Sequence, residues 1–333
     1  MSFWRIYRVF KCLTWRRALN FLRAASCHCL ALFGIAPDVR HKPVFLSVEP
    51  ANTCNLRCPQ CAIGNGMTQP KPGMMTEEML QKILDETGDT LLEMTFFFQG
   101  EPLINKNLPQ LIGMAHQCGI YTLCSTNAQL LTERRADELV RSGLDRLIIS
   151  MDGHIQESYG QYRVGGDVQR VYDALRFVSE AKKRLGSRTP EVELQCLLLR
   201  STEDSIAFLQ SNYRDMGADT LTLKTAQFYD YEHGDPLMPT DERMSRYARQ
   251  KDGTYRLKGR LWRHCWRMVA GAVIDANGSV RPCCFDKMPQ HAYGNIAEHT
   301  LLECWWGQRA QAFRKAVMAH RENIDICQNC TNV

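Results

Sequence analysis

Three cysteines lie within eight positions in the stretch CNLRCPQC, which spans residues 54–61. No fourth cysteine is near them, although a structural zinc site uses four protein ligands. Thiolates also hold iron–sulfur clusters, and three thiolates on a cubane of four irons leave one iron without a protein ligand. Such an iron can bind a small molecule through an amine and a carboxylate. The spacing therefore predicts a cluster with one open iron, and a zinc site completed by a distant ligand is the alternative.

The cysteine loop follows a short apolar stretch, VFLSVEP at residues 44–50, which we expect to be a buried strand. The pattern predicts further strands and helices in alternation: strands at 92–98, 121–126, 146–151, 191–199 and 220–226, and helices at 76–87, 107–119, 132–143, 168–186 and 205–217. This alternation indicates an α/β fold with a parallel sheet and right-handed crossovers, either open or closed into a barrel. The cysteine loop then lies at the carboxyl end of the sheet, where α/β folds bind ligands.

Four more polar motifs follow the predicted strands. They are QGEP (99–102), STN (125–127), SMDG (150–153) and YRVGGD (162–167). Together with the Cys-x3-Cys-x2-Cys spacing, they resemble the radical S-adenosylmethionine (SAM) superfamily over about residues 44–226. The resemblance implies a partial (β/α)6 barrel, with a 4Fe–4S cluster held by Cys54, Cys58 and Cys61. It also implies reductive cleavage of SAM to a 5′-deoxyadenosyl radical, which abstracts hydrogen from a substrate.

The same resemblance implies which residues contact SAM: Gln99, Gly100, Glu101, Pro102, Ser125, Asn127, Ser150, Asp152 and Arg163. Gly100 lets the backbone approach closely, and Glu101 complements the methionyl ammonium. Asp152 corresponds to a ribose contact and Arg163 to a contact with the SAM carboxylate. Gln99 departs from the family, which has glycine at that position.

A second set of cysteines lies near the C-terminus: Cys265, Cys283, Cys284, Cys327 and Cys330. With Cys283 as a ligand, four thiolates are available, which is full ligation for a cubane. The order Cys265, Gly278, Cys283 resembles the SPASM/twitch extension of radical SAM enzymes. The Cys-x2-Cys-x5-Cys-x3-Cys run of full SPASM domains is missing, so we expect one auxiliary 4Fe–4S cluster on Cys265, Cys283, Cys327 and Cys330. Cys284 in place of Cys283 is one alternative, and a zinc ribbon is another.

The chain has fifteen cysteines, an odd number in uneven clusters. This distribution favours metal ligation in a reducing cytoplasm over a disulfide framework. The remaining cysteines are expected to be small buried hydrophobic residues: Cys12, Cys27, Cys29, Cys118, Cys124, Cys196 and Cys304. The net charge is only +5, and we expect no nucleic-acid partner. No stretch is long and apolar enough for a membrane-spanning helix.

Residues 1–36 combine arginines with large apolar residues and contain no acidic residue before Asp38. This mixture predicts one or two basic amphipathic helices, which can lie on an anionic membrane surface. The alternative is a helix packed on the body with its basic face in water. We discount a secretory signal because the cysteine clusters need a reducing interior. We therefore expect a cytoplasmic protein that is peripheral at the membrane where this segment binds it.

These expectations divide the chain into a helical extension (1–40), a radical SAM partial barrel (41–230), a linker or active-site loop (231–260) and a twitch/SPASM-like domain (261–333). The main hypothesis is a two-electron oxidation of a small alcohol, sugar or lipid-linked substrate, with an electron donor such as flavodoxin or ferredoxin. A peptide- or protein-modifying maturase is the alternative, and a zinc-bearing, membrane-recruited binding module is the alternative of another class. Candidates for the base are Lys224, Tyr229, Asp230, Glu232 and Asp286.

Overall fold

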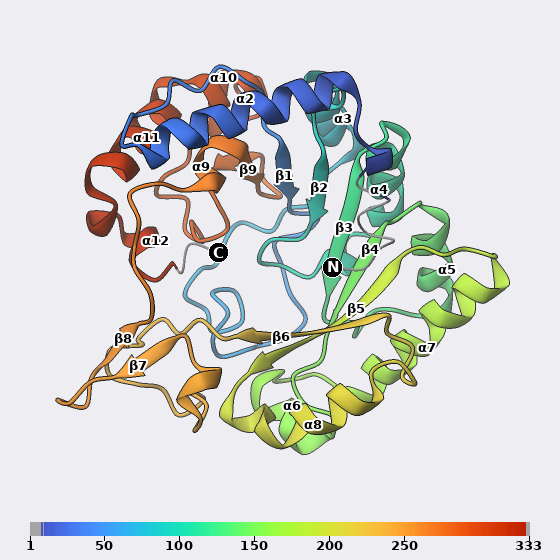
Figure 1. Cartoon of the computed structure of the whole chain (residues 1–333). Helices are drawn as coiled ribbons and strands as arrows, with labels where there is room; N and C mark the ends of the chain where they lie inside the picture. Colours follow the sequence, from blue (N-terminus) through green and yellow to red (C-terminus); the bar gives the residue numbers. More distant parts are fainter. Residues whose placement is uncertain (1–7, 9, 331–333) are drawn as a thin grey trace.

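Six parallel strands form the centre of the molecule, which is a computed structural model that describes residue 8 and residues 10–330 (Figure 1). They pair in chain order, so each crossover adds one strand to the same edge. The strands are β1 (Phe45–Val48), β2 (Glu93–Phe96), β3 (Tyr121–Thr126), β4 (Arg146–Ser150), β5 (Glu191–Leu198) and β6 (Thr220–Thr225). The crossover helices are α3 (Glu77–Thr87), α4 (Leu108–Gln117), α5 (Glu133–Arg141), α6 (Gln156–Tyr162), α7 (Val168–Arg184) and α8 (Glu203–Asn212). The predicted α/β class and partial barrel are confirmed.

The crossover helices begin at polar capping residues. The hydroxyls of Thr76 and Thr132 accept hydrogen bonds from the third residue after them, at the start of α3 and α5. The Asp167 carboxylate accepts from Gln169 N at the start of α7. Each such bond satisfies a backbone donor that the first helical turn leaves without a partner. The apolar faces of these helices then cover β4, whose five residues are all buried.

The sheet continues on the other side of β1 with strands from the C-terminal part of the chain. These are β9 (Gly271–Ile274), β10 (Ser279–Arg281) and β11 (Gly294–Asn295). β9 pairs with β1 in parallel, from Phe45 opposite Gly271 to Val48 opposite Ile274, and β10 is antiparallel to β9. Gly278 lies in the turn between β9 and β10 with φ of 85°, which favours glycine. The C-terminal hairpin is therefore part of the barrel's own sheet.

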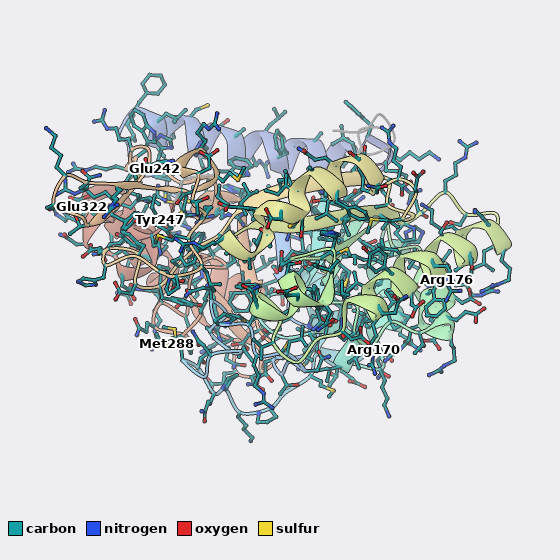
Figure 2. All side chains as sticks on the ribbon, turned by 90° about the horizontal axis from the view of Figure 1, so that it is seen from below. Arg170, Arg176, Glu242, Tyr247, Met288 and Glu322 are labelled. Carbon is teal, nitrogen blue, oxygen red and sulfur yellow. The ribbon has the colours of Figure 1, made fainter. Side chains whose placement is uncertain are left out.

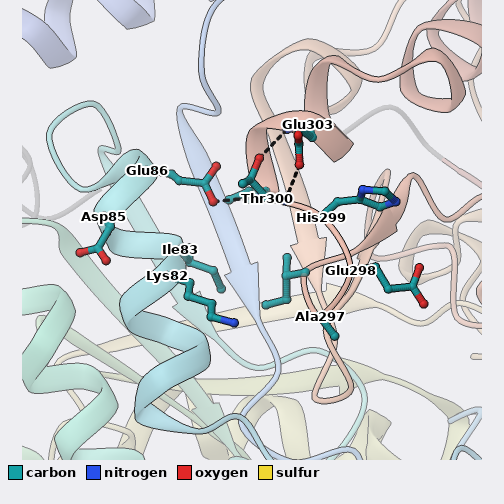
Figure 3. Close-up of a pocket in the computed structure, with 11 residues that line it drawn as sticks. Lys82, Ile83, Asp85, Glu86, Ala297, Glu298, His299, Thr300 and Glu303 are labelled. Atoms are coloured by element: carbon teal, nitrogen blue, oxygen red, sulfur yellow. Dashed lines mark hydrogen bonds between the residues drawn. The ribbon is translucent and has the colours of Figure 1, made fainter.

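Helices of the C-terminal part pack beside this hairpin: α9 (Trp266–Ala270), α10 (Leu301–Trp306), α11 (Gln308–His320) and α12 (Asp325–Gln328). Glu86 of α3 joins them to the barrel, because its carboxylate accepts hydrogen bonds from Leu301 N at 3.0 Å and Leu302 N at 2.8 Å. Figure 3 shows this carboxylate at the head of α10, beside the capping pair of Thr300 and Glu303. A carboxylate at a helix N-terminus is favourable, so this contact fixes α10 on α3.

The polar region 227–260, predicted to be a linker or site-lining loop, contains a hairpin of β7 (Tyr247–Arg249) and β8 (Tyr255–Leu257). Tyr247 is fully buried, and its ring stacks on Tyr231 at 4.8 Å between centroids. Its hydroxyl donates to Asn329 Oδ1 at 2.8 Å, which fastens the hairpin to the C-terminal end of the described chain. Short 3₁₀ turns complete the chain: Pro102–Ile104, Arg200–Thr202, Glu242–Met244 and Arg321–Asn323.

Helix α2 (Trp15–Leu32) lies along the end of the molecule where β1 and β2 begin (Figure 1). The buried Arg17 donates to the carbonyls of Gly88, Cys118 and Gly119, which precede β2 and β3. Asn20 bonds the backbone of Lys42 in both directions, just before β1. The predicted N-terminal helix is thus confirmed over this range, whereas residues 1–7 and 9 lie outside the described part. None of the helices in that part is long and apolar enough to cross a membrane.

Candidate functional site

The loop of Cys54, Cys58 and Cys61 lies at the carboxyl end of β1, as predicted. Cys58 is buried and the other two are half-buried, beside Leu56 and Tyr162. Burial raises the pKa of Cys54 to about 11 and also raises the pKa of Cys58. All fifteen cysteines lie in the described residues and are free thiols. The three sulfurs are therefore available as ligands, and burial shields Cys58 most.

Two donors reach these sulfurs from other strands of the barrel. Asn127 Nδ2, after β3, lies 3.8 Å from Cys54 Sγ, and Arg163 Nη1, after α6, lies 4.0 Å from Cys58 Sγ. The Arg163 charge opposes the effect of burial on the Cys58 pKa. Donors of this kind stabilise the thiolate form that binds iron. Two residues predicted from separate motifs thus meet at the cysteine loop.

Gly100 and Glu101 lie between this loop and β3. A Cβ on Gly100 would stand 2.0 Å from the Ala51 carbonyl oxygen, so only glycine fits there. Glu101 is buried, and its carboxylate accepts from Thr126 Oγ1 at 2.6 Å and Asn127 N at 2.9 Å. Burial raises the pKa of Glu101, and these hydrogen bonds oppose the rise. The motif that begins at Gln99 therefore builds a fixed carboxylate against β3, and Pro102 follows it at the start of a 3₁₀ turn.

Asp152 and Arg163 form a buried ion pair. Arg163 Nε donates to Asp152 Oδ2 at 2.6 Å, and Leu197 N donates to Asp152 Oδ1 at 2.6 Å. Burial lowers the pKa of Arg163, but the charges of Asp152 and Cys58 outweigh it and raise the pKa well above its usual value. Ser150 ends β4 just before this pair, and Ser125 is the penultimate residue of β3. The predicted SAM contacts from Gln99 to Asp152 thus lie at the carboxyl end of the sheet or in the turns that follow it, and Arg163, after α6, joins them through Asp152.

Glu49 is a site residue that the motifs do not identify. Its carboxylate accepts from the backbone N–H groups of Gln99 at 3.0 Å and Gly100 at 3.2 Å, and from Ala276 N at 3.2 Å in the C-terminal hairpin. Gln99, the departure from the family motif, donates from its amide to the Lys287 carbonyl at 2.8 Å. The side chains of Glu49 and Gln99 thus tie the predicted SAM-binding turn to the C-terminal part. The one signal for Glu49 is a lone acid at the end of an apolar strand.

The second cysteine set converges on a small cavity in the C-terminal part. Its lining includes all four predicted ligands, Cys265, Cys283, Cys327 and Cys330, whereas Cys284 is not in the lining. Burial raises the pKa of Cys327 to about 11, and burial with the nearby thiols raises the pKa of Cys283. The geometry therefore brings the four predicted cysteines together.

Arginines supply positive charge to this cavity. Arg321 Nη2 lies 3.6 Å from Cys330 Sγ, while its buried Nε has no partner among the described residues. Arg267 also lines the cavity. Burial lowers the pKa of Arg267, but the nearby thiols outweigh it and raise the pKa. An orphaned buried donor beside four thiols fits an anionic iron–sulfur cluster. In the described residues, no three His, Cys, Asp or Glu side chains are grouped so as to hold a metal ion; a cubane instead gives each thiolate its own iron.

Lys287 and Tyr229 form a hydrogen-bonded pair near both cysteine sets. Lys287 Nζ donates to Tyr229 Oη at 2.9 Å. Both groups sense the charge of Cys61, and Lys287 also senses that of Cys284. Burial lowers the pKa of Lys287 and raises that of Tyr229, so burial favours the neutral form of each. Lys287 is a polar residue that the sequence reasoning missed.

The other candidate bases lie in different surroundings. Asp230 pairs with His233 in water, with 72% of its side chain exposed, and Glu232 is also exposed. Asp286 is fully buried, and its Oδ2 has no partner among the described residues. Lys224 lies on β6 and is exposed. Exposed carboxylates lack the environment that shifts the pKa of a catalytic group. The structure therefore does not support Asp230 or Glu232 as the base.

The expectation that the remaining cysteines are buried holds only in part. Cys124, Cys196 and Cys304 are buried as predicted, and Cys12 and Cys27 are half-buried. For Cys29 and Cys118 the prediction is wrong, because both are exposed. Cys118 is the residue after the last turn of α4 and not an interior position, and Cys29 lies on the outer side of α2. Periodicity alone does not say which side of a helix, or of its end, faces the core.

Two sets of largely shielded cysteines beside one α/β sheet indicate the class of an iron–sulfur enzyme built on a partial barrel. Residues 48–190 match the family model of the Radical SAM superfamily, and residues 265–331 match that of the SPASM iron–sulfur cluster-binding domain. The chain belongs to the radical SAM superfamily and carries a SPASM domain. Members of this superfamily bind SAM and a 4Fe–4S cluster, and SPASM domains bind further iron–sulfur clusters.

Two curated relatives are PqqA peptide cyclases. The one from Granulibacter bethesdensis is 26% identical over 293 residues, which cover 82% of this chain and 76% of the relative. The one from Bradyrhizobium diazoefficiens is 28% identical over 226 residues, which cover 66% of this chain and 57% of the relative. The match therefore spans little more than half of the second relative's length.

Solved structures share the fold. The enzyme anSMEcpe with bound AdoMet has a TM-score of 0.64 at 18% identity, covering 86% of this chain and 85% of that one. Streptococcus suis SuiB bound to precursor peptide SuiA has a TM-score of 0.63 at 13% identity, covering 94% and 76%. BtrN in complex with AdoMet and 2-DOIA has a TM-score of 0.53 at 20% identity, covering 88% and 94%. At these identities the likeness is one of fold.

Proposed function

We propose that this protein reductively cleaves SAM at a 4Fe–4S cluster held by Cys54, Cys58 and Cys61, and that it oxidises a peptide substrate. The observation that carries the proposal is the meeting of three motifs at one loop: Asn127 lies 3.8 Å from Cys54 Sγ, and Arg163 lies 4.0 Å from Cys58 Sγ. When bound, the cluster and SAM supply a 5′-deoxyadenosyl radical that takes a hydrogen atom from the substrate.

The protein's own residues would position SAM and keep water out. Glu101, held by Thr126 and Asn127, would accept a hydrogen bond from the methionyl ammonium. Gly100 keeps the backbone close to the segment that leads into the cysteine loop. Asp152 would contact the ribose, and its ion pair with Arg163 fixes both side chains. Gln99, Pro102, Ser125 and Ser150 complete the proposed set. Fixed, buried polar groups of this kind need little reorganisation when a charged ligand binds.

The second proposed site is one auxiliary 4Fe–4S cluster on Cys265, Cys283, Cys327 and Cys330, which line one cavity. Cys283 is preferred to Cys284 because only Cys283 is in that lining. This group would accept the electron that remains after hydrogen abstraction. The hydrogen-bonded pair of Lys287 and Tyr229 is our candidate for taking up the substrate proton, since burial favours a neutral amine at Lys287. The proposal treats 41–230 as the barrel, 231–260 as the intervening loop and 261–333 as the auxiliary-cluster domain.

The proposed substrate class is a peptide. Both named sequence relatives are called PqqA peptide cyclases, which favours the peptide alternative over the small alcohol, sugar or lipid-linked substrate of the main hypothesis. A reducing compartment and a low-potential donor such as flavodoxin or ferredoxin follow from the need to reduce the cluster. The zinc-bearing binding module, the alternative of another class, predicts zinc and no SAM cleavage.

The test begins with anaerobic reconstitution, metal analysis and assay of 5′-deoxyadenosine after adding dithionite and SAM. We expect about eight irons per chain, since each cubane holds four, and cleavage that is lost in Cys58→Ala. Cys118→Ala, which removes an exposed thiol outside both sets, is the matched control and should cleave SAM normally. Zinc with negligible iron, or cleavage that persists in Cys58→Ala, would refute the proposal.

The substrate class needs a separate measurement. Candidate precursor peptides and small alcohols are each incubated with the reduced enzyme and SAM, and the masses of the products are determined by mass spectrometry. Loss of two hydrogens from a peptide, with deuterium transfer into 5′-deoxyadenosine from a labelled peptide, is the expected result. Turnover of a small alcohol and of no peptide would refute the peptide class and support a small substrate, while the proposed SAM cleavage would still stand.

A further inference from the structure

Helix α2 packs polar and small residues against the body and exposes its large apolar residues, which is the reverse of an ordinary surface helix. Its buried residues are Arg17, Asn20, Ala24 and Ala31. Its exposed residues include large apolar side chains, with Trp15 72% exposed and Leu22 60% exposed. A surface helix normally buries its apolar stripe and presents its polar residues to water. This inversion leaves an apolar helix face without a partner in the described chain.

The exposed apolar residues form one outward stripe. Trp15, Leu19 and Leu22 follow at spacings of four and three residues, and Leu30 continues the stripe two turns later, so all four share one side of the helix. Phe33, which is 83% exposed, follows the end of the helix. Ten of the eighteen large apolar side chains that are exposed in the described chain lie between residues 10 and 35. Such concentration marks an interaction surface.

The charges that residues 10–37 themselves contribute beside this stripe have one sign. Lys11, Arg16 and Arg23 are exposed, and residues 10–37 contain no Asp or Glu. Arg16 and Arg23 lie along the same edge of the stripe, seven residues apart. Arg16 Nη1 contacts Asp89 at 3.1 Å, a half-exposed surface pair that contributes little. An apolar stripe with a basic edge is complementary to a surface that is apolar below and anionic above.

The position of the helix leaves the candidate site free. Arg17 and Asn20 fix α2 at the amino ends of β1, β2 and β3, whereas both the cysteine loop and Glu101 lie at the carboxyl ends. Figure 2 shows α2, in faint blue, along one edge of the molecule, with side chains that project beyond it into the surroundings. A flat surface seated on α2 would therefore not cover the mouth of the barrel.

We propose that the outward face of α2, with Trp15, Leu19, Leu22 and Leu30 as its apolar stripe and Arg16 and Arg23 as its basic edge, docks the enzyme on a membrane surface rich in anionic lipid. The apolar stripe enters the interface between headgroups and acyl chains, and the arginines contact lipid phosphates. A second copy of the chain fits this face less well, because a two-fold dimer places each basic edge on an identical surface without charge complementarity.

This docking orients the molecule with its active-site mouth away from the lipid. A membrane-bound enzyme of this geometry takes its substrate from the aqueous side, which suits the peptide substrate of the proposed function. The docking surface is independent of the proposed chemistry, since none of its residues belongs to either cysteine set or to the SAM-binding turns.

The test is cosedimentation of the full chain with vesicles of phosphatidylcholine, with and without phosphatidylglycerol. We expect binding to the anionic vesicles that weakens with added salt. The double variant Leu19→Ser/Leu22→Ser should bind at least about a hundredfold more weakly, because it removes two leucines from the apolar interface. Arg16→Gln/Arg23→Gln should bind about thirtyfold more weakly to anionic vesicles only, because two contacts with lipid phosphates are lost.

Matched controls separate the face from general surface effects. Phe208→Ser on α8 removes another exposed apolar residue, and Arg176→Gln on α7 removes another exposed arginine (Figure 2); both should bind vesicles like the wild type. Thermal unfolding checks that every variant is folded. Equal vesicle binding by the wild type and the leucine variant overturns the proposal. A concentration-dependent dimer in sedimentation that the leucine variant abolishes, without vesicle binding by the wild type, assigns the face to a second copy instead.

Discussion

At the scale of single residues, Gly100 brings the turn after β2 against the segment that leads into the cysteine loop. A Cβ there would stand 2.0 Å from the Ala51 carbonyl oxygen and 2.8 Å from that of Thr53. Both neighbours are backbone atoms of the segment that leads into Cys54, and Glu101 N donates to Thr53 O at 2.8 Å. An added methyl group must therefore move the cysteine loop itself.

We expect Gly100→Ala to lower the free energy of unfolding by about 1–3 kcal/mol, the usual cost of overpacking, and to abolish SAM cleavage because the loop is displaced. Gly113→Ala in α4 is the matched control, since the nearest atom outside its own helix backbone would be Ser142 O at 3.9 Å. That change should raise stability slightly, as alanine favours a helix interior. Denaturant unfolding and 5′-deoxyadenosine formation measure the two effects; normal cleavage by Gly100→Ala would contradict the close approach.

Residues inside motifs could be predicted from the sequence, and residues outside them could not. Gly100, Asn127 and Arg163 stand in recognisable patterns after strands, and all three lie around the cysteine loop. Glu49 accepts from backbone N–H groups, and Lys287 bonds the Tyr229 hydroxyl; a pattern of residue types does not encode such contacts. Their partners are up to 227 positions away along the chain.

At the scale of elements, His41 joins three helices. Its Nε2 bonds the Val269 carbonyl at 2.6 Å in α9, and its own carbonyl accepts from the indoles of Trp305 and Trp306 in α10. Cys27 Sγ of α2 lies 3.7 Å from His41 Nδ1. Burial lowers the pKa of His41, so the neutral ring is the form that the fold accommodates.

The sign of the resulting pH effect follows from this lowered pKa. The unfolded chain takes up a proton near pH 6.5, while the folded chain resists it. The contribution of His41 to stability is therefore complete above that pH and is lost as the pH falls below it. We expect the unfolding temperature to drop between about pH 7.5 and about pH 5.5, and His41→Asn to flatten that drop. His320→Asn, at an exposed position, is the control; an unchanged pH profile in His41→Asn would count against this reading.

Elements with strong apolar periodicity were predictable, and weaker ones were not. The six strands and the long α7 follow directly from apolar runs bounded by breakers. The hairpin of β7 and β8 was missed because its strands are three residues each and polar, and its stability depends on the single buried ring of Tyr247. The orientation of α2 could not be predicted either, because periodicity identifies an apolar stripe without showing which side of the helix packs on the protein.

At the scale of the whole molecule, the C-terminal part is joined to the barrel through the sheet itself. β9 pairs with all four residues of β1, so the strand before the cysteine loop has a barrel strand on one side and a SPASM strand on the other. The local pattern of each part predicts its own strands but cannot predict this pairing, which joins segments more than two hundred positions apart. The segments that carry the two cysteine sets are therefore connected through one continuous sheet.

A substitution of Glu49, directly after β1, tests whether the link between the barrel and the C-terminal part supports the site. Its carboxylate accepts from Gln99 N and Gly100 N on one oxygen and from Ala276 N on the other. Glu49→Gln keeps the shape but replaces one acceptor oxygen by an NH₂ group, which leaves at least one buried N–H without a partner. We expect a loss of about 1–3 kcal/mol in the free energy of unfolding.

The location of faster amide hydrogen exchange tests this role of Glu49 more sharply than the loss in the free energy of unfolding does. If the carboxylate joins the two parts, amide hydrogen exchange in Glu49→Gln should quicken both in the turn at 99–101 and in the hairpin turn at 275–278. Glu157→Gln on the exposed side of α6 should change neither segment. Faster exchange confined to one of the two turns would mean that Glu49 supports that turn alone, and that the strand pairing of β1 with β9 holds the parts together without it.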